Sequence, residues 1–218
     1  MKILFILLSI SCFSIGCTKN KIEKTSLDSI PSDTIAVQKA IPYAEFLTQL
    51  KNSDLYKTNR KERFFDYINT DIPNYWIGTP WSFGGTTQKP QEGTIACGYF
   101  VTNVLSDFGI SLNRIGLAQQ ASSVMIKQLC AKNSIKHFAK YTDVESYMKN
   151  RNAKEIYIVG LDFHTGFLIR DNDSVYFLHS NYINKKGVTK ELLSDSQAFQ
   201  QSKSFMLGSL SDNNKLFE

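Results

Sequence analysis

The segment from Gly93 to Leu112 constrains the fold more than any other part of the chain. Apolar residues recur in it at the spacing of a single helical face, and they are Phe100, Val101, Val104, Leu105 and Phe108. This pattern predicts a helix that begins close to Cys97, buries its apolar stripe against a core and stops at Gly109.

Cys97 lies at the N-terminus of this predicted helix. The unpaired N–H groups and the positive end of the backbone dipole favour the thiolate over the thiol at such a position. The same N–H groups can hold an oxyanion after the sulfur attacks a carbonyl. The position therefore predicts a nucleophilic cysteine, and the alternative is a small buried hydrophobe, the commoner role of a single cysteine.

The remaining apolar patterns predict an α+β fold in which N-terminal helices pack on an antiparallel β-sheet. Helices are expected in 41–68, with a charged break at 57–61, and again near 124–129, 144–148 and 192–200. Short β-branched and aromatic runs predict strands at 155–162, 164–170, 174–182 and 204–210, with a turn at 171–173.

His164 and His179, two of the chain's three histidines, fall on neighbouring predicted strands. A hairpin through the turn at 171–173 brings them to the same end of the sheet. If the helix that carries Cys97 packs across that end, His164 can take the thiol proton and His179 can orient the ring of His164. Each histidine by itself would be read as a surface residue or a hydrogen-bonded core residue.

A glycine-rich loop from Gly78 to Gly85 precedes the cysteine and holds two aromatic residues. Such a loop lets the backbone approach a ligand closely. Together with the two neighbours of the nucleophile, it supplies the candidate substrate-binding residues, which are Trp81, Phe83, Gly84, Gly85, Ala96 and Gly98.

The first residues of the chain resemble an export signal, with one cation before an apolar run too short to span a bilayer. The order Ser14-Ile15-Gly16-Cys17 resembles a bacterial lipoprotein cleavage site, in which Cys17 becomes the lipidated first residue; the alternative is an ordinary signal peptide. We therefore expect a signal segment (1–16), a polar tether (17–40) and a single domain (41–218). The protein is then an exported lipoprotein of the cell envelope, membrane-anchored and either periplasmic or associated with the outer membrane.

The chain carries 25 Lys and Arg against 20 Asp and Glu, so its net charge is modestly positive. These charges are scattered rather than clustered, which gives no indication of a nucleic-acid partner. We expect a monomer. Cys97 and Cys130 are the cysteines outside the signal region, and because export compartments permit disulfides, a structural Cys97–Cys130 bond is an open alternative.

At the level of motifs, the chain resembles the NlpC-type, papain-like cell-wall cysteine peptidases. That family has a Gly-Thr-Pro-aromatic-x-aromatic-Gly-Gly loop, then Asp-Cys-Ser-Gly-aromatic on a helix, then a His-x-Gly-hydrophobic strand and a later His-small strand end. The matching segments here are Gly78 to Gly85, Cys97 to Val101, His164 to Leu168, and His179-Ser180.

The resemblance implies a papain-like fold with Cys97 as nucleophile, His164 as general base and then acid, and His179 as the orienting residue. It implies hydrolysis of an amide in peptidoglycan stem peptides through a thioester, without a metal or organic cofactor, and with the N–H of Cys97 as one oxyanion donor. Ala96 stands where the family has the aspartate that pairs with a free amine of the substrate, so that specificity is in doubt, and Gly98 stands where the family has serine. Trp81 replaces a usual tyrosine and can wall a subsite but cannot act as a hydroxyl.

Three alternatives stay open besides peptidoglycan hydrolysis. The same site fits a CHAP-like amidase or a lipid-directed acyl hydrolase, with Asn181 competing with His179 as the orienting residue. Because both neighbours of Cys97 are altered, the chain also fits a lipoprotein that binds cell-wall fragments or a partner without turnover. The third alternative is a purely structural domain with a Cys97–Cys130 disulfide.

Overall fold

The computed structural model describes residues 41–218. The expected signal segment (1–16), the lipidation site Cys17 and the tether (17–40) lie outside the described residues.

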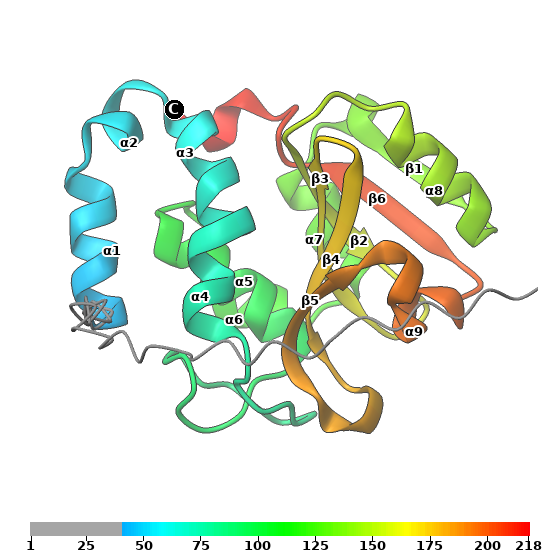
Figure 1. Ribbon diagram of the computed structural model, residues 1–218, viewed down its shortest axis with the longest axis horizontal. Coiled ribbons are helices and arrows are strands. Elements are labelled where there is room, and N and C mark those ends of the chain that lie inside the picture. The colour runs from blue at the N-terminus through cyan, green and yellow to red at the C-terminus, as the bar shows by residue number, and fades with distance from the viewer. Residues whose placement is uncertain (1–40) are drawn as a thin grey trace, which may run out of the picture. The chain divides into compact units, whose positions relative to one another are not determined.

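Six strands form one antiparallel sheet in the order β1-β6-β2-β3-β4-β5 (Figure 1). The strands are β1 (Ile135–Phe138), β2 (Glu155–Gly160), β3 (Thr165–Asp171), β4 (Ser174–Asn181), β5 (Gly187–Leu192) and β6 (Phe205–Ser209). The helices are α1 (Tyr43–Asn52), α2 (Asp54–Thr58), α3 (Arg60–Asp66), α4 (Ile72–Trp76), α5 (Cys97–Phe108), α6 (Arg114–Ala118), α7 (Ser122–Leu129), α8 (Tyr141–Lys149) and α9 (Gln197–Gln200). A π-helical turn, η1 (Tyr67–Asp71), joins α3 to α4. The predicted α+β class is confirmed.

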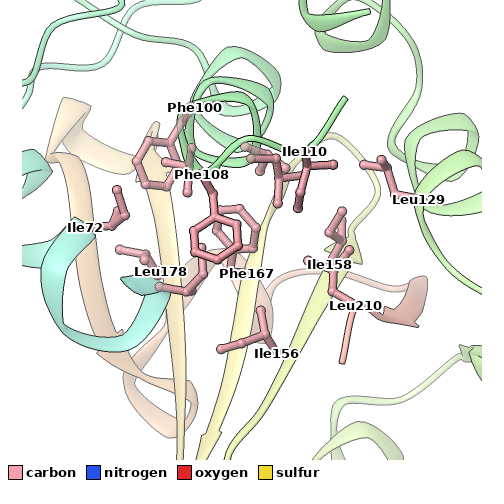
Figure 2. Packing of buried hydrophobic residues seen from close by; sticks show 14 of the residues in the cluster. Ile72, Phe100, Phe108, Ile110, Leu129, Ile156, Ile158, Phe167, Leu178 and Leu210 are labelled. Atoms are coloured by element: carbon pink, nitrogen blue, oxygen red, sulfur yellow. The ribbon is translucent and has the colours of Figure 1, made fainter. Parts of the chain in front are cut away.

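Helix α5 matches its prediction at both ends. It begins at Cys97, directly after the extended residue Ala96, and it ends at Gly109, whose φ of 99° lies in the left-handed region that glycine adopts without strain. Its apolar stripe is fully buried against one face of the sheet, where Phe100 and Phe108 pack beside Phe167 and Leu178 (Figure 2). This packing places the first turn of α5 against the sheet and thereby fixes the position of Cys97.

The opposite face of the sheet is covered by α8 and α9, so the sheet lies between two helical layers (Figure 1). Val144 and Met148 of α8 and Phe199 of α9 form a second buried cluster with strand residues such as Tyr157 and Phe177. Apolar side chains on both faces explain why the central strands appear in the sequence as continuous apolar runs rather than as alternating patterns.

Strands β3 and β4 form the predicted hairpin. Asp171 pairs with Ser174, and the turn between them is made by Asn172, with a φ of 49°, and Asp173. His164 directly precedes β3 and His179 lies near the end of β4, so both histidines are at the end of the sheet that faces the start of α5.

Some elements differ from the sequence predictions. The break expected at 57–61 is confined to Asn59, whose side chain accepts a hydrogen bond from Glu62 N and caps α3. The helix expected at 192–200 is reduced to α9, because Leu192 ends strand β5 and Leu193–Asp195 forms a separate 3-10 turn. Strands β1 and β5 were missed because they are the two edges of the sheet and carry exposed or half-buried polar residues.

Among the described helices, none combines the length and the apolar character that a membrane crossing requires.

Candidate active site

Cys97 and His164 line the same cleft, which has a volume of about 720 Å³. The cleft lies where the N-terminus of α5 meets the start of β3, and the loop that precedes α5 forms one of its walls. Its other lining residues are Trp81, Phe83, Gly84, Thr86, Ala96, Gly98, Tyr99, Ala118, Gln119, Phe163 and Tyr182.

The thiol of Cys97 is largely enclosed by protein. Burial raises its pKa above the ordinary value, while backbone N–H groups of Thr165, Gly98 and Cys97 itself act in the opposite direction. The sequence predicted a thiolate from the helix N-terminus alone. In the folded protein burial outweighs the N–H groups, so the thiol form is favoured at neutral pH.

His164 and His179 contact each other directly. His164 Nε2 lies 2.7 Å from His179 Nδ1, and both side chains are buried. The contact depends on Gly166, because a Cβ atom there would lie 2.7 Å from His179 Cβ and also 2.7 Å from the ring of Phe177. The glycine of the His-x-Gly segment thus leaves the space that the second histidine occupies.

Burial lowers the pKa of both rings. His164 is held well below its ordinary value, first by burial and then by its neighbour His179. Burial also lowers the pKa of His179, and Glu191 offsets part of that effect. Both imidazoles are therefore neutral at pH 7, the form in which an imidazole can accept a proton.

Glu191 of β5 is a member of this cluster that the sequence did not reveal. Its Oε1 lies 3.2 Å from His179 Nε2, and its side chain is only 13% exposed. Burial raises the pKa of this carboxyl, but the hydrogen bond with His179, the nearby Ser196 hydroxyl and the charge of Lys186 outweigh it, so the pKa is lowered and the group is a carboxylate. Glu191 was missed because no strand was predicted in the segment that forms β5 beside β4.

The glycine after the nucleophile has a steric explanation. A Cβ atom at Gly98 would lie 2.3 Å from the carbonyl oxygen of Ala118, at the end of α6. Helix α6 packs so closely on the first turn of α5 that the serine of the resembled motif has no room. Ala96, the residue before Cys97, lines the cleft and offers no side-chain hydrogen bond to the N-terminus of α5.

The glycine-rich loop contributes most, but not all, of its predicted residues to the cleft. Trp81, Phe83 and Gly84 line it. Gly85 does not, because it is buried against Ile95, where an added Cβ atom would lie 2.5 Å from the backbone nitrogen. Gly85 therefore fixes the loop rather than touching the cleft.

Two further aromatic residues, Phe163 and Tyr182, complete the wall of the cleft and were not singled out in the sequence. Phe163 is 96% exposed and Phe83 is 89% exposed, while the ring centroids of Trp81 and Tyr182 are 6.3 Å apart. The lining holds no Asp, Glu, Lys or Arg side chain, and His164 is neutral. The cleft therefore presents apolar and uncharged polar groups to its ligand.

Two alternatives are decided by these positions. Asn181 does not orient His164, because its side-chain oxygen accepts a hydrogen bond from Ile183 N in the turn after β4. Cys97 and Cys130 are both free, so the structural disulfide is not formed. Cys130 lies instead beside Gly208 of β6, and burial raises its pKa to about 12.

Within residues 41–218, no three or more His, Cys, Asp or Glu side chains are grouped so that they can hold a metal ion. A scan against protein-family models gave no match, and searches of curated proteins and of solved structures gave none either. The interpretation of the site therefore depends on its own geometry.

Proposed function

We propose that this protein is a cysteine hydrolase of the cell envelope that cleaves an amide bond in peptidoglycan stem peptides through a thioester intermediate. The observation that carries the proposal is that Cys97 and His164 share one cleft while His164 Nε2 contacts His179. A nucleophile, a neutral base and an orienting group are the parts that thiol hydrolysis needs. In this proposal the fold is the papain-like arrangement of the NlpC-type peptidases, and Cys17 carries the lipid anchor.

The reaction begins from a neutral pair, because burial raises the pKa of Cys97 and lowers that of His164. His164 Nδ1 takes the thiol proton as the sulfur attacks the carbonyl carbon of the substrate. The backbone N–H of Cys97 donates to the oxyanion of the tetrahedral intermediate. The imidazolium then gives its proton to the leaving amine, and a water activated by His164 hydrolyses the thioester.

A digest of purified muropeptides followed by mass spectrometry tests this proposal. We expect wild-type protein and the Cys130→Ala variant to release the same fragments, and Cys97→Ala to release none. Unchanged substrate with wild-type protein would contradict the peptidoglycan assignment. If that substrate nevertheless binds, the result would favour a binding lipoprotein.

The uncharged aromatic cleft favours a second candidate, the hydrolysis of an amide or ester with an apolar acyl group. Stem peptides carry carboxylates, and no cationic side chain lines this cleft. Exposed Phe83 and Phe163 are instead suited to an apolar chain. Assaying N-acyl amides of increasing chain length beside the muropeptides separates the two candidates, since only an acyl hydrolase gains kcat/KM with chain length.

A further inference from the structure

We infer that Glu191 is a positioning residue whose carboxylate fixes the tautomers of both buried histidines, so that His164 presents a lone pair on Nδ1 for the thiol proton of Cys97. The role in catalysis rests on the function proposed above. The tautomers themselves do not depend on it.

The three groups lie in or directly beside three adjacent strands. His164 directly precedes β3, His179 is in β4 and Glu191 is in β5. In the β4–β5 register, Phe177 faces Glu191 and His179 faces Thr189, so Glu191 and His179 are diagonal neighbours on the same face of the sheet. The sheet register therefore places the carboxylate at the ring nitrogen of His179 that His164 does not use.

The contact between the two histidines does not by itself define a direction. A neutral imidazole has one N–H donor and one acceptor nitrogen, so either ring can donate across the 2.7 Å contact. If His179 donated, His164 Nε2 would be the acceptor and His164 Nδ1 would carry the proton. In that tautomer His164 could not accept the proton of Cys97 through Nδ1.

The carboxylate removes this ambiguity, because an ionised carboxylate only accepts hydrogen bonds. His179 Nε2 must therefore carry the proton that Glu191 accepts, and this leaves His179 Nδ1 as an acceptor. His164 Nε2 must then be the donor, which leaves the lone pair on His164 Nδ1. One carboxylate thus sets the protonation of two rings in sequence.

The same arrangement also suits the imidazolium that forms during the reaction. When His164 Nδ1 takes the thiol proton, Nε2 still donates to His179 and His179 still donates to Glu191, so no hydrogen bond has to reverse. Lys186 is the other charged group close enough to affect both His179 and Glu191, and it lies exposed beyond β4.

Nitrogen-15 NMR of the imidazole rings tests the inference without any substrate. The chain has only three histidines, so the spectrum is simple, and His164→Gln and His179→Gln variants assign the two buried rings. We expect both rings to be neutral at pH 7 with the proton on Nε2. A proton on Nδ1 of His179 would overturn the inference whether or not the protein is an enzyme.

The variant Glu191→Gln keeps the size of the side chain but can also donate a hydrogen bond. We expect a mixture of tautomers in both rings and, on a substrate identified by the digests, a kcat lowered about 10- to 100-fold with little change in KM. Glu45→Gln, an exposed glutamate on α1, serves as the control and should change neither quantity. An unchanged single tautomer in Glu191→Gln would overturn the inference, and if that variant does not fold, the wild-type spectrum decides.

A wild-type protein that shows both expected tautomers but cleaves no substrate would contradict the proposed function while leaving the assignment of Glu191 intact. A protein that cleaves muropeptides with His179 protonated on Nδ1 would support the proposed function and contradict the assignment of Glu191.

Discussion

At the scale of single residues, the chemistry of the site is set by burial more than by the helix dipole. Cys97 occupies the N-terminus of α5, where N–H groups favour a thiolate, yet enclosure by the cleft raises its pKa. His164 is shifted in the opposite direction by the same cause. The resting pair is consequently thiol and imidazole rather than thiolate and imidazolium.

The neutral pair predicts how Cys97 reacts with iodoacetamide. We expect slow alkylation at pH 6 and a rate that rises continuously up to pH 10, because the thiolate is the reacting form and the pKa of Cys97 lies above its ordinary value. Cys130 should react more slowly still, since it is buried and its pKa is raised to about 12. Mass spectrometry of the labelled peptides gives both rates, and equal rates in urea provide the control. Fast, pH-independent labelling of Cys97 below pH 7 would indicate an ion pair instead.

The two histidines should differ in how much activity they support. His164→Ala removes the base and should lower kcat/KM about 100- to 10,000-fold, the range of general acid–base catalysis. His179→Ala removes an orienting contact and should leave a measurable fraction of the activity. Steady-state kinetics on the substrate found by digestion measures both variants, with the exposed His137→Ala as the control. Equal losses from His164→Ala and His179→Ala would mean that the contact between the rings is as necessary as the base.

At the scale of elements, the sequence predicted what depends on local pattern and missed what depends on neighbours. The limits of α5 and the β3–β4 hairpin follow from apolar spacing and from residues such as Gly109 and Asn172. From these alone the meeting of Cys97, His164 and His179 could be anticipated. Strand β5 could not be anticipated, since its residues Lys190 and Glu191 carry no strand pattern. For the same reason Glu191 was not among the predicted site residues.

The packing of α6 on α5 also could not be predicted from the local spacing of apolar residues. Gly98 was read as a departure that altered substrate choice, whereas the structure shows that the carbonyl of Ala118 occupies the place of its side chain. The reason for the glycine is a contact with a residue 20 positions along the chain, and the spacing of apolar residues carries no information about it.

Restoring the serine of the resembled motif should therefore destabilise the protein. We expect Gly98→Ser to lower the free energy of unfolding by about 1 to 3 kcal/mol, because its Cβ would lie 2.3 Å from the Ala118 carbonyl oxygen and α6 would have to move. Gly84→Ser is the matched control, since a Cβ atom there meets nothing within 4 Å. Denaturant unfolding measures both, and equal stability of the two variants would refute the steric explanation.

At the scale of the whole molecule, the first helix is tied to the core by a buried polar cluster. The Tyr43 hydroxyl of α1 donates to Asp107 Oδ2 at 2.9 Å, and the Tyr67 hydroxyl donates to the carbonyl of Val104 at 3.0 Å. Burial raises the pKa of Asp107 to about 6, although the hydrogen bond from Tyr43 partly opposes this shift. The carboxyl group of Asp107 therefore accepts the hydrogen bond from Tyr43 in a partly desolvated position.

This shift makes stability depend on pH. Because the pKa of Asp107 is about 6 in the folded protein and 3.8 in the reference state, the folded form binds more protons between these values, and stability falls as pH rises through that window. The full effect is at most about 3 kcal/mol, at 1.36 kcal/mol per pKa unit. Asp107→Asn keeps an acceptor for Tyr43 without the charge, so it should be more stable than wild type at pH 7 by about 1 to 3 kcal/mol.

Denaturant unfolding from pH 4 to pH 7 measures the difference between the two proteins. The advantage of Asp107→Asn should grow with pH and level off above pH 6. Asp143→Asn, which alters an exposed acid in the first turn of α8, should show no such trend. A constant difference between Asp107→Asn and wild type would mean that the carboxyl titrates normally.

The division of the site between two layers has a consequence for the chain before it folds. The sulfur belongs to a helix, whereas His179 and Glu191 belong to adjacent strands of the sheet on which that helix packs, and His164 directly precedes the strand beside them. A nascent or partly unfolded chain therefore carries a solitary thiol without a proton acceptor beside it. In the proposed reaction the thiol gains its proton acceptor only when helix and sheet have joined, so completion of the core also completes the site.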